Sequence, residues 1–182
     1  MSTDVERPKK IVLMDAYCPS HVGNDVLLDS SMEFVQRLYP GAEVSVHARK
    51  RDSFAASHGL ICKQRLFPSP PSGSFFKYAW YIKEMFYIVL QLLNAYTLRL
   101  PPYYLSIGSK RETVRDYADS DVAVSIGGEL ISDTFWKVLP LHLHMFWLAK
   151  QSGAQVVIFP QSIGPLRRGW TRRIARFALS RC

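Results

Sequence analysis

The stretch KIVLMDAYCPSHVGNDVLLDSSMEFVQRLYPGAEVSVH, residues 10–47, decides the fold class of this chain. It opens with Lys10 to Asp15, a short apolar run that is typical of a buried strand. From Asp25 to Leu38 apolar residues recur at helical spacing, and Pro40–Gly41 ends that pattern. Glu43 to His47 then alternates like a second strand. Strand, helix and strand in this order predict the βαβ unit of a parallel sheet. We expect Asn24 or Asp25 to cap the helix.

The remainder of the chain continues the same alternation. Two more apolar runs, Asp121 to Ile126 and Gln155 to Phe159, predict further strands. We expect one or two amphipathic helices over Phe75 to Leu100 and a short helix over Lys110 to Ala118. A further helix, with a kink or split at Pro140, is expected between the last two strands, and a final helix is expected after Pro165. We therefore expect an α/β fold, a Rossmann-like parallel sheet with helices on both faces, over residues 10–182, after a polar lead over residues 1–9.

Length and composition fit one ordered domain. The chain has 182 residues, of which 48% are hydrophobic, and this excludes a disordered protein. Three widely spaced cysteines favour reduced thiols in the cytoplasm over a disulfide framework. The polar N-terminus has no apolar core of the kind that secretion signals carry. A net charge of +8 favours anionic partners.

Three loops follow predicted strands, at the edge where open α/β sheets bind ligands. They are HVGND (21–25), GGELISD (127–133) and QSIGP (161–165). None matches the dinucleotide-binding or P-loop pattern, so both of those functions are disfavoured. The candidate substrate-binding residues are Gly23, Asn24, Asp25, Gly127, Gly128, Glu129, Gln161, Ser162, Gly164 and Arg168. The simpler alternative is that the glycines only permit tight turns.

Other polar residues form weaker candidates. Cys18 and His21 could pair as a thiol and a base, but no second Cys/His pair at zinc spacing supports a metal site. His142 and His144 are two positions apart, so on a helix they face different sides and are expected to be partly buried. Asp15 could pair with Asp25, the acid of the first loop, but the sequence does not determine how the two side chains would be arranged.

Arginines concentrate near the end of the chain, at positions 167, 168, 172, 173, 176 and 181. A solvated basic helix face explains most of them, and an anionic substrate or an anionic lipid are the alternatives. Arg167 and Arg168 differ because they directly follow the third loop. No nucleic-acid-binding motif accompanies the cluster, so we expect no nucleic acid partner. For Phe75 to Leu100, packing onto the sheet or a partner domain is favoured over contact with a membrane surface.

Taken in order, the three loops resemble those of the polysaccharide pyruvyl transferase family. The matching residues are Gly23-Asn24-Asp25 with Leu27-Leu28, then DVAVSIGGE (121–129), then FPQSIGPL (159–166). The last is the most specific, because it is similar to the family's Q-[SG]-I-G-P signature. Two details depart from the pattern: Asn24 directly follows Gly23 where many members have an acid, and Glu129 follows Gly128 where many have another glycine.

The resemblance implies an enzyme that transfers the pyruvyl group of phosphoenolpyruvate to a hydroxyl of a glycan or lipid-linked sugar, as in exopolysaccharide or cell-wall synthesis. It implies no cofactor and no metal. The fold would be one half of a two-domain, GT-B-like enzyme working in the cytoplasm or at the inner face of the membrane. We expect the second, C-terminal domain to carry much of the active site, so no catalytic residue is assigned. The alternatives are a GT-B-like glycosyltransferase half and a truncated, non-catalytic binding module on a membrane or scaffold.

Overall fold

Five parallel strands form the centre of the molecule. The computed structural model describes residues 10–16, 22–48, 62–128 and 131–180. The strands are β1 (Lys10–Ala16), β2 (Glu43–Ala48), β3 (Cys62–Gln64), β4 (Val122–Ser125) and β5 (Gln155–Ile158), and they lie in the order β3-β2-β1-β4-β5. Every neighbouring pair is parallel. The expected α/β fold with a Rossmann-like sheet is confirmed.

Five helices surround this sheet in the described residues: α1 (Val22–Leu38), α3 (Ser74–Tyr96), α4 (Ser109–Ala118), α5 (Leu139–Gln151) and α6 (Gly169–Leu179). Two boundaries correct the sequence-based expectations. The helix α1 begins at Val22, so Asp25 lies in its first turn and does not cap it. Pro140 lies in the first turn of α5, where its missing N–H costs no helical hydrogen bond, and a short 3-10 turn (Asp133–Phe135) precedes it.

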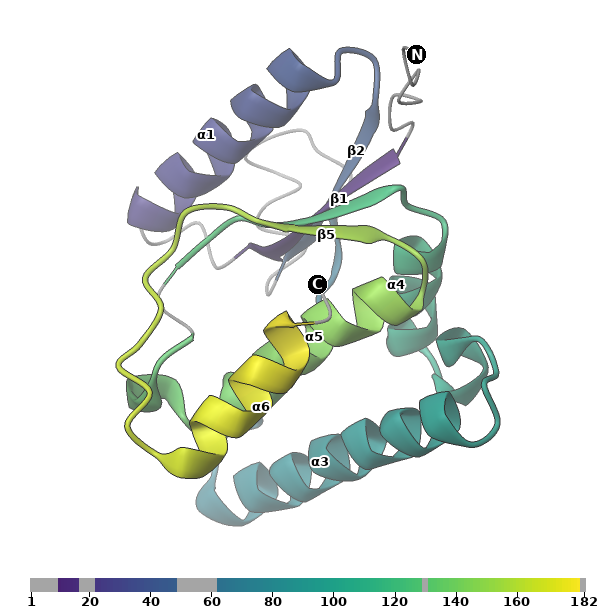
Figure 1. The fold of residues 1–182 in the computed structure, drawn as a ribbon, viewed down its shortest axis with the longest axis vertical. Coiled ribbons are helices and arrows are strands. Elements are labelled where there is room, and N and C mark those ends of the chain that lie inside the picture. The colour runs from purple at the N-terminus through teal and green to yellow at the C-terminus, as the bar shows by residue number, and fades with distance from the viewer. Residues whose placement is uncertain (1–9, 17–21, 49–61, 129–130, 181–182) are drawn as a thin grey trace.

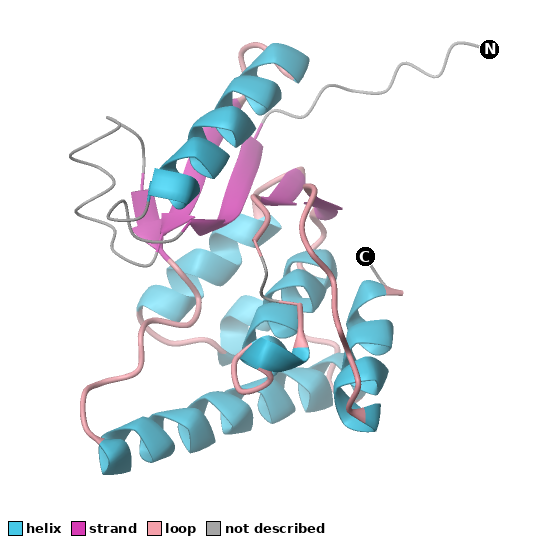
Figure 2. Cartoon of the chain, turned by 90° about the vertical axis from the view of Figure 1, so that its left-hand side faces the viewer, coloured by secondary structure: helices cyan, strands magenta, loops and turns pink. Residues whose placement is uncertain are grey.

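The two faces of the sheet are covered unequally. Alternate residues of β1 point to opposite faces: Ile11 and Leu13 contact the apolar side of α1, while Val12 and Met14 belong to the core beneath α4, α5 and α6. Figures 1 and 2 show α1 on one side of the sheet and the other helices on the opposite side. Helices therefore cover both faces, as expected.

The long helix α3 forms an outer layer. It packs against α5 and has few contacts with the strands. Of the two expected packing surfaces for this segment, the sheet or a partner domain, the sheet is therefore wrong. Its inner side buries three polar residues, Glu84, Gln91 and Asn94, each with a partner. Glu84 is paired with Lys110, Gln91 Nε2 donates to the Pro102 carbonyl at 3.0 Å, and Asn94 Nδ2 donates to the Leu100 carbonyl at 2.7 Å. No helix among the described residues is apolar over enough of its length to cross a membrane.

A single buried carboxylate, that of Asp116 on α4, binds side chains from three strands. Its Oδ1 lies 2.8 Å from Lys10 Nζ of β1 and 2.5 Å from Lys63 Nζ of β3. Its Oδ2 accepts from Ser45 at 3.0 Å and lies 2.7 Å from His47 Nε2, both on β2. Burial disfavours the charged carboxylate, but the hydrogen bonds from its histidine and lysine partners outweigh that cost and hold the pKa of Asp116 well below its usual range.

Replacing this carboxylate is expected to destabilise the fold. At pH 7, Asp116→Asn should lower the free energy of unfolding by about 2 kcal/mol, because two lysines lose their counter-charge. The native pKa of Asp116 is lowered, so its stabilisation is complete above the unfolded-state pKa near 4 and is lost as the pH falls below it. The difference between wild type and variant should therefore shrink toward pH 2, as measured by urea denaturation.

The matched control is Glu112→Gln, which removes an exposed carboxylate from the same helix. It should change stability by less than about 0.5 kcal/mol at either pH. A difference between Asp116→Asn and wild type that stays constant from pH 7 to pH 2 would contradict the ionic role of this carboxylate.

Candidate functional site

The carboxyl ends of β1, β4 and β5 lie side by side and bring the predicted loops to one edge of the sheet. The Ile126 N–H donates to the Met14 carbonyl at 3.4 Å, and the Phe159 N–H donates to the Ser125 carbonyl at 3.0 Å. The strand order reverses between β1 and β4, since the chain runs from β1 outward to β3 and then returns to β4. A crevice at such a reversal is where open α/β sheets bind ligands.

Residues of the first predicted loop are helical. Gly23 is exposed in the first turn of α1, and Asp25 is half-buried in the same turn. Asp25 Oδ1 is buried and has no hydrogen-bond partner among the described residues. Asn24 belongs to the helix, but its side chain, like Cys18 and His21, lies outside the described residues. This segment therefore contributes a helix N-terminus, which carries partial positive charge, where a free loop was expected.

The second and third loops cross in close contact at Gly127. This residue has φ +97°, and a Cβ added to it would lie 2.9 Å from the Pro160 carbonyl oxygen. Side chains rarely tolerate either condition, so glycine is required here for the backbones to approach. Gly128 also has a positive φ of +129°, with open space around it. Glu129 lies outside the described residues.

Asp133, the last residue of the second loop, joins that loop to the third loop and to α6. Its Oδ2 accepts from the N–H groups of Arg167 and Arg168 at 2.6 and 2.9 Å, and its Oδ1 accepts from Thr171 Oγ1 at 2.6 Å. These hydrogen bonds, that from Thr171 first, lower the pKa of Asp133. Two backbone bonds add to the junction: Gly164 N–H donates to Ile131 O at 2.7 Å, and Asp133 N–H donates to Pro165 O at 3.1 Å. The two loops therefore form one structural unit.

Gln161 stands out among the predicted binding residues. Its side chain is half-buried, and both Nε2 and Oε1 are shielded from solvent without a hydrogen-bond partner among the described residues. Its Cβ lies 3.9 Å from the position that a Gly127 Cβ would take. The buried Ser125 Oγ, at the end of β4, also has no partner in the described structure. Buried polar groups are normally hydrogen-bonded, so these atoms are suited to receive a ligand. Ser162 is exposed, and Gly164 has φ +95°.

Arg168 is held by an aromatic ring. It is exposed at the start of α6, and its Cζ lies 4.8 Å from the centroid of Trp136. Trp136 in turn meets Trp170 edge-on, with centroids 6.2 Å apart. The guanidinium therefore rests in a cation–π contact beside the third loop and still has polar edges to offer an anion.

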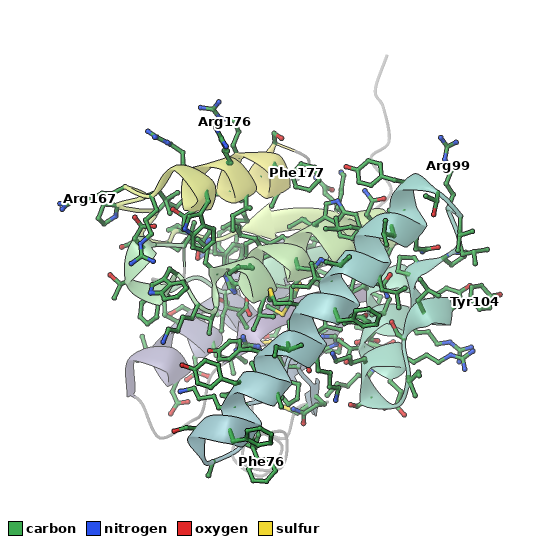
Figure 3. All side chains as sticks on the ribbon, turned by 90° about the horizontal axis from the view of Figure 1, so that it is seen from below. Phe76, Arg99, Tyr104, Arg167, Arg176 and Phe177 are labelled. Atoms are coloured by element: carbon green, nitrogen blue, oxygen red, sulfur yellow. The ribbon has the colours of Figure 1, made fainter. Side chains whose placement is uncertain are left out.

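The α6 arginines form the expected basic face. Arg172, Arg173 and Arg176 are exposed, while the inner side of the helix buries Thr171, Ala175 and Ala178. Figure 3 shows Arg176 pointing out from α6 and away from α3. These three arginines lie on the solvent side of a packed helix, which fits the simplest interpretation of the cluster.

A buried pair at the end of β1 was not predicted. Asp15, with φ +69°, lies 3.3 Å (Oδ2) from Nδ1 of His142 on α5 and 4.0 Å (Oδ1) from Arg65 Nε. Burial opposes ionisation of Asp15, but His142 and then Arg65 counter it, so the pKa of Asp15 is lowered. The pairing considered for Asp15 with an acid of the first loop is replaced by this contact. His142 and His144 face different neighbours, as expected, but both are fully buried where partial burial was expected.

The strand order defines a Rossmann-like domain, and the joined strand-end loops form its candidate site at the carboxyl edge of the sheet. The family model for polysaccharide pyruvyl transferases matches residues 21–182, which is most of the chain. The chain therefore belongs to the polysaccharide pyruvyl transferase family, as its loops indicated. Comparison with curated proteins gave no significant match. Comparison with solved structures gave none either.

The crossing at Gly127 can be tested by adding one methyl group. Gly127→Ala should lower the free energy of unfolding by about 2–4 kcal/mol, because the Cβ meets the Pro160 carbonyl and the positive φ is strained. The measurement is urea denaturation followed by circular dichroism.

Gly23→Ala is the matched control. A Cβ at Gly23 meets nothing within 4 Å, and the residue is helical, so alanine there should be neutral or stabilise by up to about 1 kcal/mol. Equal stabilities for the two variants would show that the loops are not in contact at Gly127.

Proposed function

We propose that this chain binds phosphoenolpyruvate at the carboxyl edge of its sheet and takes part in transferring the pyruvyl group to a sugar hydroxyl. The family match gives the reaction class. The observation that carries the placement is the unpartnered side chain of Gln161, next to the crossing at Gly127. A buried amide with no partner is costly unless a ligand completes its hydrogen bonds.

Transfer of the pyruvyl group requires cationic groups and a proton donor. Phosphoenolpyruvate carries a carboxylate and a phosphate, and both suit the paired donors of an arginine. Protonation of its methylene carbon makes C2 electrophilic; two sugar hydroxyls add to C2, and inorganic phosphate leaves, so that a ketal is formed. A general acid must supply the proton, and positive charge must stabilise the departing phosphate.

The described residues can meet part of this demand. Gln161 offers an amide donor and acceptor, and the start of α1 adds partial positive charge near the end of β1. Arg168 lies just beyond the third loop, where its N–H donates to Asp133 of the second loop. We assign no catalytic acid to these residues and propose that a second domain, facing the loops across a cleft as in GT-B-like enzymes, supplies it.

An aromatic groove beside Arg168 is our candidate for the acceptor, a glycan or lipid-linked sugar. The groove has a volume of about 640 Å³ and lies between the start of α3, the start of α5 and Trp170. It is lined by Tyr78, Tyr81, Met85, Trp136, Pro140 and Trp170, with Ser74, Lys77 and Lys137 as polar groups. Large apolar surfaces with few polar groups are typical of small-molecule sites. We place the reaction in the cytoplasm.

Ligand binding tests the donor site. Phosphoenolpyruvate should raise the melting temperature of the protein, and nucleotide sugars should not. Gln161→Ala should weaken phosphoenolpyruvate binding roughly tenfold in calorimetry, through the loss of a buried polar contact. The matched control is Gln155→Ala, an exposed glutamine at the opposite end of β5, which should bind like wild type.

Three results would count against the proposal. Stabilisation by a nucleotide sugar in place of phosphoenolpyruvate would favour a glycosyltransferase half. Equal losses for the two glutamine variants would remove Gln161 from the site. Release of phosphate at an enzymatic rate by the 182-residue protein, given phosphoenolpyruvate and a glycan, would refute the need for a second domain.

A further inference from the structure

The outward side of α3 carries a continuous row of exposed apolar residues, which we call the outer stripe. Its members are spaced three or four positions apart and are each at least 50% exposed: Phe75, Tyr78, Ile82, Phe86, Val89, Leu93 and Tyr96. This spacing places them on one face of the helix, over nearly its full length. Isolated exposed apolar residues are ordinary, but a contiguous row of this size marks an interaction surface.

The outer stripe is additional to the face that α3 uses within the fold. The opposite side of the helix is already packed, through Tyr87 and its neighbours, against Leu141, Met145 and Trp147 of α5. The polar residues of α3 are divided in an unusual way, since Glu84, Gln91 and Asn94 are buried inside while the apolar row faces out. Ordinary amphipathic packing of a surface helix gives the reverse arrangement.

Charge around the outer stripe has one sign. From Ser74 to Pro101, the helix and its C-terminal flank, the sequence holds three basic residues, Lys77, Lys83 and Arg99, and one acid, Glu84. The acid is buried and paired with Lys110. Lys77, Lys83 and Arg99 are exposed. The surface presented by α3 is therefore apolar and positively charged, which complements an anionic lipid surface.

We infer that the outer stripe docks this protein on an anionic membrane, with α3 lying flat in the interface. The helix has 23 residues, a length of about 35 Å, so the whole row can enter the headgroup region at once. Tyr78 and Tyr96 lie near its two ends, and tyrosine is favoured at membrane interfaces. Lys77 and Lys83 can reach the phosphates of the lipid headgroups from the sides of the stripe.

A second copy of the chain fits the stripe less well. Two stripes packed against each other would bring Lys77 and Lys83 of the two copies together, and α3 itself has no exposed acid to pair with them. Helix pairs that associate through apolar rows place opposite charges at these flanks. Charge therefore favours lipid over self-association.

The placement of α3 determines which surfaces face the membrane. It lies at the edge of the molecule opposite α1, so docking leaves the sheet and α1 in water (Figure 1). Arg176 of α6 is not part of the docking face, because Figure 3, viewed onto α3, shows its side chain pointing away from that helix. The aromatic groove is lined on one side by α3 and includes Tyr78 of the outer stripe, so it opens beside the docked face.

Vesicle flotation tests this inference. The protein should float with vesicles of phosphatidylcholine and phosphatidylglycerol, and much less with phosphatidylcholine alone. Ile82→Ser combined with Phe86→Ser should reduce the bound fraction at least about tenfold, since both side chains are some 70% exposed and are expected to insert. Lys83→Glu should weaken binding to the anionic vesicles and reduce its salt dependence.

The matched controls lie away from the stripe. Leu38→Ser removes a half-exposed leucine from α1, and Arg176→Glu reverses a charge on α6. Leu38→Ser should float like wild type, and Arg176→Glu should lose less binding than Lys83→Glu. Circular dichroism and melting temperature will show whether the variants are folded. If the double variant does not fold, membrane docking is still tested by Lys83→Glu and by the lipid dependence of the wild-type protein.

Several outcomes would overturn the inference. One is the absence of flotation with anionic vesicles. Another is a stripe variant that floats as well as wild type, or a Leu38→Ser variant that fails equally. A third is a protein that does not bind vesicles but forms a stable dimer in light scattering, with the stripe variant remaining a monomer.

Discussion

The carboxylate of Asp116 is the constraint on which the sheet depends most. It lies beneath three neighbouring strands and binds a lysine from β1, a lysine from β3 and two side chains of β2. An anion in that position fixes α4 to the sheet and lets two cations lie close together under the strands. The central strand β1, which Asp116 binds through Lys10, also pairs with β4 on its other side, so the strand that carries this contact is the one next to the candidate site.

Much of the fold could be predicted because its signals are local. The apolar runs of β1, β4 and β5 and the helical spacing of α1 are visible within a few residues of sequence. The strand β3 could not be found this way, since Cys62–Gln64 is short and polar and is held by long-range contacts, its pairing with β2 and the bonds of Lys63 and Gln64 to α4. The start of α1 was misplaced for a related reason: Asn24 and Asp25 are good capping residues, but here they fall inside the first turn.

The site was predictable in its positions and not in its contacts. Glycines after predicted strands do lie together at one edge of the sheet, and Gly127 is required there because of the Pro160 carbonyl. No local pattern in the sequence predicts that the Asp133 carboxylate bonds to the backbone after the third loop and to Thr171 of α6, which are more than 30 residues away in the chain. The same is true of Asp15 and His142, which meet only when α5 packs on the sheet. Such long-range polar contacts depend on the finished packing.

The stacking of Arg168 on Trp136 has a consequence for selectivity. A guanidinium over an indole face keeps its N–H groups at the edge of its own plane. The ring therefore limits where the arginine can lie without using up its hydrogen-bond donors. A planar anion arriving there would meet those paired donors edge-on and would share the arginine with Trp136, with no need to displace it from the ring.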